Sequence, residues 1–173
     1  MNRRVWFWVL FLVTLGIYLT IVLWSLPMIS KEAAGLMPFD LRPGGYSEDE
    51  AREFLGAISD DGRAFYLGVQ HWIDTAYPGL MAITLAFAIN WAGQSWHKLV
   101  RFGLIGAGFV GAGFDYLENS RVANMLIQHV ADVSAADIAA ASQATLLKSG
   151  FGTLAMVGLF AGLIIRGYQR WRG

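Results

Sequence analysis

Four long runs of apolar residues divide the chain, with shorter polar segments between them. The runs cover about residues 5–26, 66–91, 99–127 and 144–165. Apolar runs of about 20 residues with few charges are typical of helices that cross a bilayer. The pattern therefore predicts an all-α integral membrane protein, a four-transmembrane-helix bundle that forms a single membrane domain over residues 1–173.

The first run is the most uniform and is preceded by Arg3 and Arg4. A cleaved signal peptide is the competing interpretation, but its apolar core would be only about 7–15 residues long. The small-residue stretch that begins at Ala33 lies beyond Pro27 and two charges, which makes it a poor cleavage site. We therefore expect an uncleaved span that closes near Pro27.

Composition supports a membrane protein and excludes several kinds of site. Hydrophobic residues make up 55% of the chain and charged residues 15%, against about 25% charged in an ordinary soluble domain. The chain has no cysteine, which excludes disulfides, thiolate metal sites and cysteine nucleophiles. The formal net charge is zero, so the composition predicts no nucleic-acid partner.

Charge asymmetry predicts the orientation. One side, formed by the amino terminus, segment 92–101 and the carboxyl tail, carries only basic charges: Arg3, Arg4, Lys98, Arg101, Arg166, Arg170 and Arg172. Basic residues in short loops mark the cytoplasmic face. We expect both termini in the cytoplasm, and the bacterial inner (plasma) membrane as the location.

The longest external segment, 28–65, contains start signals for helices. Ser47 and Glu50 match a capping box, and the apolar residues that follow give an amphipathic extracytoplasmic helix between the first two spans. We expect that helix to lie on the membrane surface or over the bundle. Ser59 is a second start signal, from which a helix can run into the second span. Ser134 with Asp137 is a third, leading into the fourth.

Ionisable residues near the external ends of the spans form the candidate site. Residues three or four apart share a helix face, which groups polar side chains on the second and third spans, while the fourth span adds a lysine at a similar depth. The candidate ligand-binding residues are His71, Asp74, Tyr77, Asp115, Glu118, Asn119, Arg121 and Lys148. Carboxylates at membrane depth usually face inward and are paired, and Arg121 and Lys148 are the available cations.

Three interpretations of this cluster stay open. It could be structural and fix the register of the helices. It could bind a lipid, a headgroup or a small cationic ligand in an acidic pocket, which we take as the leading functional hypothesis. It could also be the site of an acid–base membrane enzyme acting on an apolar substrate, with Asp74, Asp115 and Glu118 as the catalytic candidates. The layout of four spans with embedded acids is similar to that of sterol-isomerase-like and sigma-2-receptor-like membrane proteins, although no motif is shared.

Cofactors and partners follow from the same residues. With a single histidine at membrane depth, we expect no metal ion and no cofactor. The expected partners are the lipid bilayer and a small-molecule or lipid ligand. Gly103, Ala107 and Gly111 place small residues four apart on the third span, which permits close helix contact within the bundle, with a membrane-protein partner or in a homodimer. An accessory or assembly subunit of a larger membrane complex is therefore an alternative function.

Overall fold

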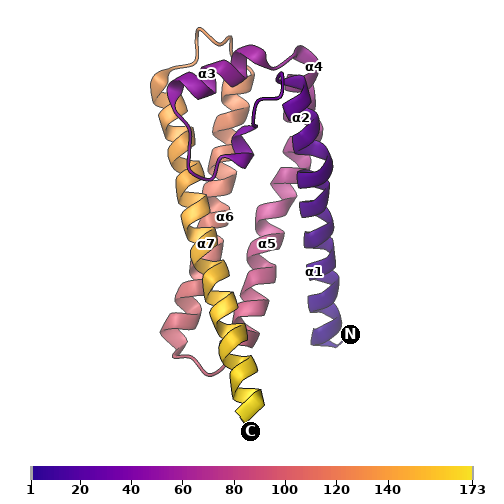
Figure 1. Cartoon of the computed structure of the whole chain (residues 1–173), viewed down its shortest axis with the longest axis vertical. Helices are drawn as coiled ribbons and strands as arrows, with labels where there is room; N and C mark the ends of the chain where they lie inside the picture. Colours follow the sequence, from indigo (N-terminus) through magenta and orange to yellow (C-terminus); the bar gives the residue numbers. More distant parts are fainter. Residues whose placement is uncertain (1, 173) are drawn as a thin grey trace.

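The chain is all-helical, as the sequence predicts. The computed structural model describes residues 2–172 and contains no strand among them. Its long helices run side by side along the length of the molecule (Figure 1): α1 (Arg3–Thr20), α5 (His71–Ala92), α6 (Lys98–Leu126) and α7 (Ala135–Arg172). The start of α1 and the end of α7 lie at the same end of the molecule.

The helices α5, α6 and α7 all contact one another, whereas α1 packs against α5 at the side. α6 comes close to the backbone of α7 at Gly111, where an added Cβ would lie 3.2 Å from the backbone nitrogen of Gly152. Ala107 is buried on the same side of α6. At Gly103, by contrast, nothing lies within 4 Å of an added Cβ. The small residues therefore serve a contact within the molecule at one end of the predicted stretch and face outward at the other.

Two of the long helices are extended by wide π-helical turns. The first continues from α1 through η1 (Ile21–Ser25) into α2 (Leu26–Glu32), and α4 (Asp60–Phe65) continues through η3 (Tyr66–Gln70) into α5. The first helix therefore does not end near Pro27. In a regular α-helix the proline ring would clash with the carbonyl of the residue four positions earlier. The π turn, in which the Leu26 N–H reaches back to the Ile21 carbonyl, widens the helix just before the proline.

Segment 33–59 folds over the end of the molecule opposite to the start of α1 (Figure 1). We call this segment the cap; it contains η2 (Phe39–Leu41) and α3 (Glu48–Ala57). Phe39 and Phe54 are fully buried in it. Their rings form a core with side chains from the ends of the long helices. Of the two predicted places for the short helix, the structure has the one over the helices.

The predicted capping box begins α3. The backbone N–H of Ser47 donates to the Glu50 carboxylate at 2.7 Å, and the Glu50 N–H donates to the Ser47 hydroxyl at 3.3 Å. The hydrogen bond from the Ser47 backbone lowers the pKa of the Glu50 carboxyl. The predicted starts at Ser59 and Ser134 are also present, since Ser59 caps α4 and Ser134 caps α7 through Asp137.

Three helical stretches are long and apolar enough to cross a membrane: Arg4–Glu32, Asp60–Ala92 and Ala135–Arg172. α6 is not among them. Its second half carries Asp115, Glu118 and Arg121, and these charged side chains lower its apolar character. Of the long helices, α6 therefore depends most on neighbouring helices to cover its charged side chains.

Candidate functional site

The two π turns meet and bury a glutamine between them. The hydroxyl of Ser25, in η1, donates to Oε1 of Gln70, in η3, at 2.5 Å. Gln70 is fully buried, and its Nε2 has no hydrogen-bond partner among the described residues. π turns inside α-helices are frequent at functional sites because they turn side chains away from the regular helical direction. Here the turn in the second helix brings Gln70 to the edge of a cavity.

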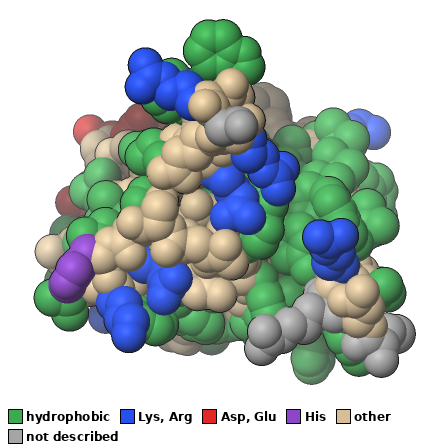
Figure 2. Space-filling view, turned by 90° about the horizontal axis from the view of Figure 1, so that it is seen from below, with side chains coloured by type: hydrophobic (Ala, Val, Ile, Leu, Met, Phe, Trp, Pro, Cys, Tyr) green, Lys and Arg blue, Asp and Glu red, His purple; other side chains and the backbone are tan. Residues whose placement is uncertain are grey.

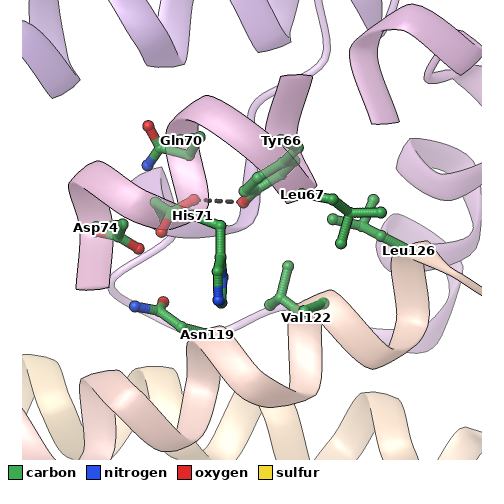
Figure 3. A pocket seen from close by; sticks show the side chains of 10 residues that line it. Tyr66, Leu67, Gln70, His71, Asp74, Asn119, Val122 and Leu126 are labelled. Carbon is green, nitrogen blue, oxygen red and sulfur yellow. Dashed lines mark hydrogen bonds between the residues drawn. The ribbon is translucent and has the colours of Figure 1, made fainter. Parts of the chain in front are cut away.

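That cavity lies between η3 and the start of α5 on one side and the end of α6 on the other (Figure 3). It contains about 10 Å³ of internal space, room for about one water-sized group. Both polar and apolar side chains line its wall, and the cap contributes one acid. The lining residues are Asp40, Tyr66, Leu67, Gln70, His71, Asp74, Asn119, Val122, Ala123 and Leu126.

Asp40 reaches this cavity from the cap. It lies in the short η2 helix, and its carboxylate accepts a hydrogen bond from the Tyr66 hydroxyl, the bond drawn as a dashed line in Figure 3. Tyr66 is itself buried. Neither residue is among the predicted site residues, because Asp40 lies in the external segment 28–65 and Tyr66 at the edge of the second apolar run. The structure adds both to the candidate site.

Asp74 is the acid in the cavity that has no partner among the described residues. It is 8% exposed, and among the described residues its carboxylate makes no hydrogen bond and no ion pair. It lies close enough to Asp40, Asp115, Glu118 and Lys148 to interact with each of them electrostatically. Because three of these four neighbours are acids, a negative charge on Asp74 would be poorly compensated by the protein alone.

Beside the cavity, one lysine pairs with the two acids of α6. Nζ of Lys148, in α7, lies 3.1 Å from the Asp115 carboxylate and also contacts the Glu118 carboxylate. Glu118 is fully buried and accepts a further hydrogen bond from the Thr145 hydroxyl at 2.5 Å. These contacts hold α6 to α7, so Asp115, Glu118 and Lys148 form a paired group, which we call the lysine cluster.

Tyr46 connects the cap to the lysine cluster. Its backbone N–H donates to the hydroxyl of Ser142 in α7 at 2.8 Å. Its side chain is buried, and its hydroxyl makes no hydrogen bond among the described residues. Burial raises the pKa of the Tyr46 hydroxyl, and the nearby Glu118 carboxylate raises it further. Tyr46 therefore stays neutral and closes the cap side of the cluster with an uncharged group.

The structure brings together six of the eight predicted site residues. His71, Asp74 and Asn119 line the cavity, while Asp115, Glu118 and Lys148 form the lysine cluster. Tyr77 instead stacks on Tyr18 of α1, with ring centres 5.9 Å apart. Arg121 makes no ion pair among residues 2–172, and its Nε is buried without a hydrogen-bond partner.

Among the described residues, the carboxylates of the site are therefore not paired with arginine, contrary to the expectation. Arg63, in α4, donates to the backbone carbonyls of Leu126 and Leu55. It holds the cap to the end of α6 rather than pairing with an acid. Lys148 is left as the cation among four acids, namely Asp40, Asp74, Asp115 and Glu118.

This arrangement suits a small organic cation better than a metal ion. In the described part of the chain, no group of three or more His, Asp or Glu side chains is close enough to hold a metal ion. The cavity instead offers carboxylates at Asp40 and Asp74. Carboxylates can bind a small positive group through charge-assisted hydrogen bonds.

Comparison of the chain with protein-family models, curated proteins and solved structures found no match.

Proposed function

We propose that this chain is an integral membrane protein with four spans, built on α1, α5, α6 and α7. Large apolar side chains are exposed along all four helices, such as Leu12, Phe87, Phe109 and Phe160 at 61, 49, 49 and 57%. A water-soluble protein rarely exposes so much contiguous apolar surface. α6 joins the other three because its acids face Lys148 inside the protein, which reduces the cost of placing them in the bilayer.

Charge gives the proposed orientation. Lys and Arg side chains gather on the end of the molecule where α1 begins and α7 ends (Figure 2). That end of the helices carries Arg4, Lys98, Arg101, Arg166, Arg170 and Arg172 and no acidic residue. By the positive-inside rule this end faces the cytoplasm, and the cap with its acidic site lies on the extracytoplasmic side.

We propose as its function the binding of a small cationic group, carried by a small molecule or a lipid headgroup, in the cavity of Asp40 and Asp74. One observation supports this most directly: Asp74 lines the cavity and forms no ion pair among the described residues, while Lys148 is already paired with Asp115 and Glu118. A bound cation would complete the charge balance that the protein leaves unfinished. In this proposal the lysine cluster is structural and the cavity is functional.

Binding to the purified protein in phosphatidylcholine nanodiscs tests this function. Methylammonium, tetramethylammonium, octylammonium and octyltrimethylammonium salts are added, and the thermal unfolding midpoint is followed. A ligand that binds only the folded state raises stability by about 2.7 kcal/mol at 100 times its Kd. We expect at least one of the four cations to raise the midpoint of the natural protein and to have a much smaller effect on Asp74→Asn.

Asp132→Asn is the matched control, because Asp132 is exposed in the loop between α6 and α7. It should respond to the cations like the natural protein. If none of the cations changes the unfolding midpoint, or if Asp74→Asn responds as strongly as the natural protein, the cavity does not bind cations and its polar residues are structural.

A further inference from the structure

The cavity has a side that faces the surface between α5 and α6. Apart from Asp40 of the cap, its wall residues come from η3, α5 and α6, and none comes from α1 or α7. His71 and Ala123, on opposite walls, are half-buried and reach the surface. Figure 3 shows the His71 ring extending from α5 towards Asn119 and Val122 on α6. A group that reaches Asp74 past these residues would come from the side of the molecule.

The surface along this seam has small residues on α5 and large exposed apolar side chains next to the cavity. On the face of α5 that contains His71, the next positions are Thr75 and Gly79. The Gly79 N–H donates to the hydroxyl of Tyr116 on α6 at 3.2 Å, which shows that these faces meet. Trp72 and Ile127, next to the cavity residues His71 and Leu126, are 76 and 69% exposed. In the proposed membrane orientation this seam contacts lipid, so a molecule arriving here carries an apolar part.

The cavity limits the size of the charged group. About 10 Å³ is open to the centre of a water-sized group, within a void of about 270 Å³ that includes the open side. The enclosed part therefore takes one group of the size of water, which fits a primary ammonium. A trimethylammonium group carries three methyl groups in place of three N–H donors. It is too large for this space, and it has no hydrogen to donate to the Asp40 and Asp74 carboxylates.

Two amides without hydrogen-bond partners among the described residues add a second requirement for the ligand. Nε2 of Gln70 and Nδ2 of Asn119 are buried and lack hydrogen-bond partners among the described residues, and both side chains line the cavity. Gln70 is 0% and Asn119 9% exposed. Buried donors of this kind cost free energy unless an acceptor reaches them. A ligand that carries oxygen atoms close to its ammonium group would satisfy both the acids and the amides.

We infer that the cavity takes the primary ammonium end of an amphiphile, such as an aminophospholipid, which reaches it sideways from the bilayer between α5 and α6. This inference rests on the proposed cation-binding function and specifies its ligand class. The carboxylates of Asp40 and Asp74 accept the ammonium hydrogens, the amides of Gln70 and Asn119 donate to headgroup oxygens, and the apolar chain remains against the outer surface of the two helices.

The four cations named above separate the parts of this inference, because they vary head size and chain length independently. In phosphatidylcholine nanodiscs, octylammonium should bind at least about tenfold more tightly than octyltrimethylammonium and than methylammonium. These comparisons use the natural protein alone and therefore do not depend on any variant folding. Asp40→Asn and Asp74→Asn should each weaken octylammonium binding by about tenfold or more, with Asp132→Asn unchanged.

A native-mass-spectrometry competition then tests the lipid itself. The protein is released from mixed membranes of phosphatidylethanolamine and phosphatidylcholine with identical acyl chains, two lipids whose headgroups differ only by three N-methyl groups. Phosphatidylethanolamine should be retained preferentially by the natural protein and by Asp132→Asn, and without preference by Asp74→Asn. A preference for octylammonium without a preference for phosphatidylethanolamine would assign the site to a free long-chain amine rather than a phospholipid.

Each failure has a different meaning. If octyltrimethylammonium binds as tightly as octylammonium, the inferred limit on head size is wrong. If methylammonium binds as tightly as octylammonium, the inferred sideways route of an amphiphile is wrong. In both cases cation binding itself would stand. If no amine binds, the proposed function and this inference fail together.

Discussion

At the scale of single residues, the most consequential side chain is Lys148. Its ammonium contacts the carboxylates of Asp115 and Glu118, and Glu118 is fully buried. Removal of one partner from a buried charge group leaves an uncompensated charge, which is more destabilising than replacement of the whole group. The lysine cluster should therefore behave as one unit.

We predict that Lys148→Met lowers the free energy of unfolding by about 3–5 kcal/mol. The triple variant Lys148→Met, Asp115→Asn, Glu118→Gln should recover much of that loss, because no buried charge then lacks a partner. Thermal or denaturant unfolding in detergent micelles measures both values. A triple variant no more stable than the single one would show that Lys148 acts through packing rather than through charge.

Part of this residue-level detail could be predicted from the sequence. Spacing on helices places Asp74 on one face and Asp115 with Glu118 on another, and the depth of Lys148 in the fourth run suggests its role. Asp40 could not be found in this way, because it lies in an irregular segment whose path depends on the burial of Phe39 and Phe54 in the cap core. Arg121 forms no ion pair with these acids among the described residues, since spacing on a helix does not say which neighbour a side chain reaches.

At the scale of elements, α6 and α7 pack closely at glycines, where no side chain keeps the two backbones apart. A Cβ on Gly111 would meet backbone atoms of α7, the Gly152 nitrogen at 3.2 Å and the Lys148 carbonyl at 3.4 Å. Backbone atoms of a helix have little freedom to move aside. Gly113, two residues further along the same helix, has nothing within 4 Å of the same position.

We predict that Gly111→Leu destabilises the protein by about 1–3 kcal/mol or more, because the larger side chain forces α6 and α7 apart and strains the lysine cluster. Gly113→Leu is the matched control and should be neutral or slightly stabilising, since leucine is the better helix former. Unfolding midpoints of the two variants in the same detergent provide the comparison. Equal effects would contradict the close approach of the two helices.

The sequence predicts the helices well, but it does not predict where they are interrupted. Cap residues such as Ser47 and Ser59 mark helix starts through local hydrogen bonds, so the sequence alone reveals them. The π turn at Ile21–Ser25 is different, because it is stabilised by a partner, Gln70, that lies 45 residues away in the chain. The sequence pattern of one helix does not contain that partner. Pro27 on its own therefore predicts the end of the helix.

At the scale of the whole molecule, the proposed orientation places the cap and the ends of the chain on opposite sides of the bilayer. The chain has no cysteine, so a single introduced cysteine can be labelled without background from the protein itself. Glu53 on α3 and Gln169 near the end of α7 are both exposed. They report on the two sides.

We predict that a membrane-impermeant maleimide labels Glu53→Cys on intact bacterial spheroplasts, since the cap faces outward. Gln169→Cys should be labelled only after the membrane is permeabilised. The reverse pattern would overturn the orientation, and labelling of both positions in intact spheroplasts would overturn the even number of spans.

The charges of α6 also have a consequence for biosynthesis. In the proposed topology, this helix leaves the ribosome before α7, and its acids then have no lysine beside them. A carboxylate near the bilayer centre costs about 2.5–3.5 kcal/mol on translocon scales, so α6 alone is a poor substrate for the insertion machinery. It becomes stable in lipid once Lys148 has been synthesised and has paired with Asp115 and Glu118. We therefore expect the last two helices to enter the membrane together as a hairpin, with the cavity beside them complete only when the chain is nearly finished.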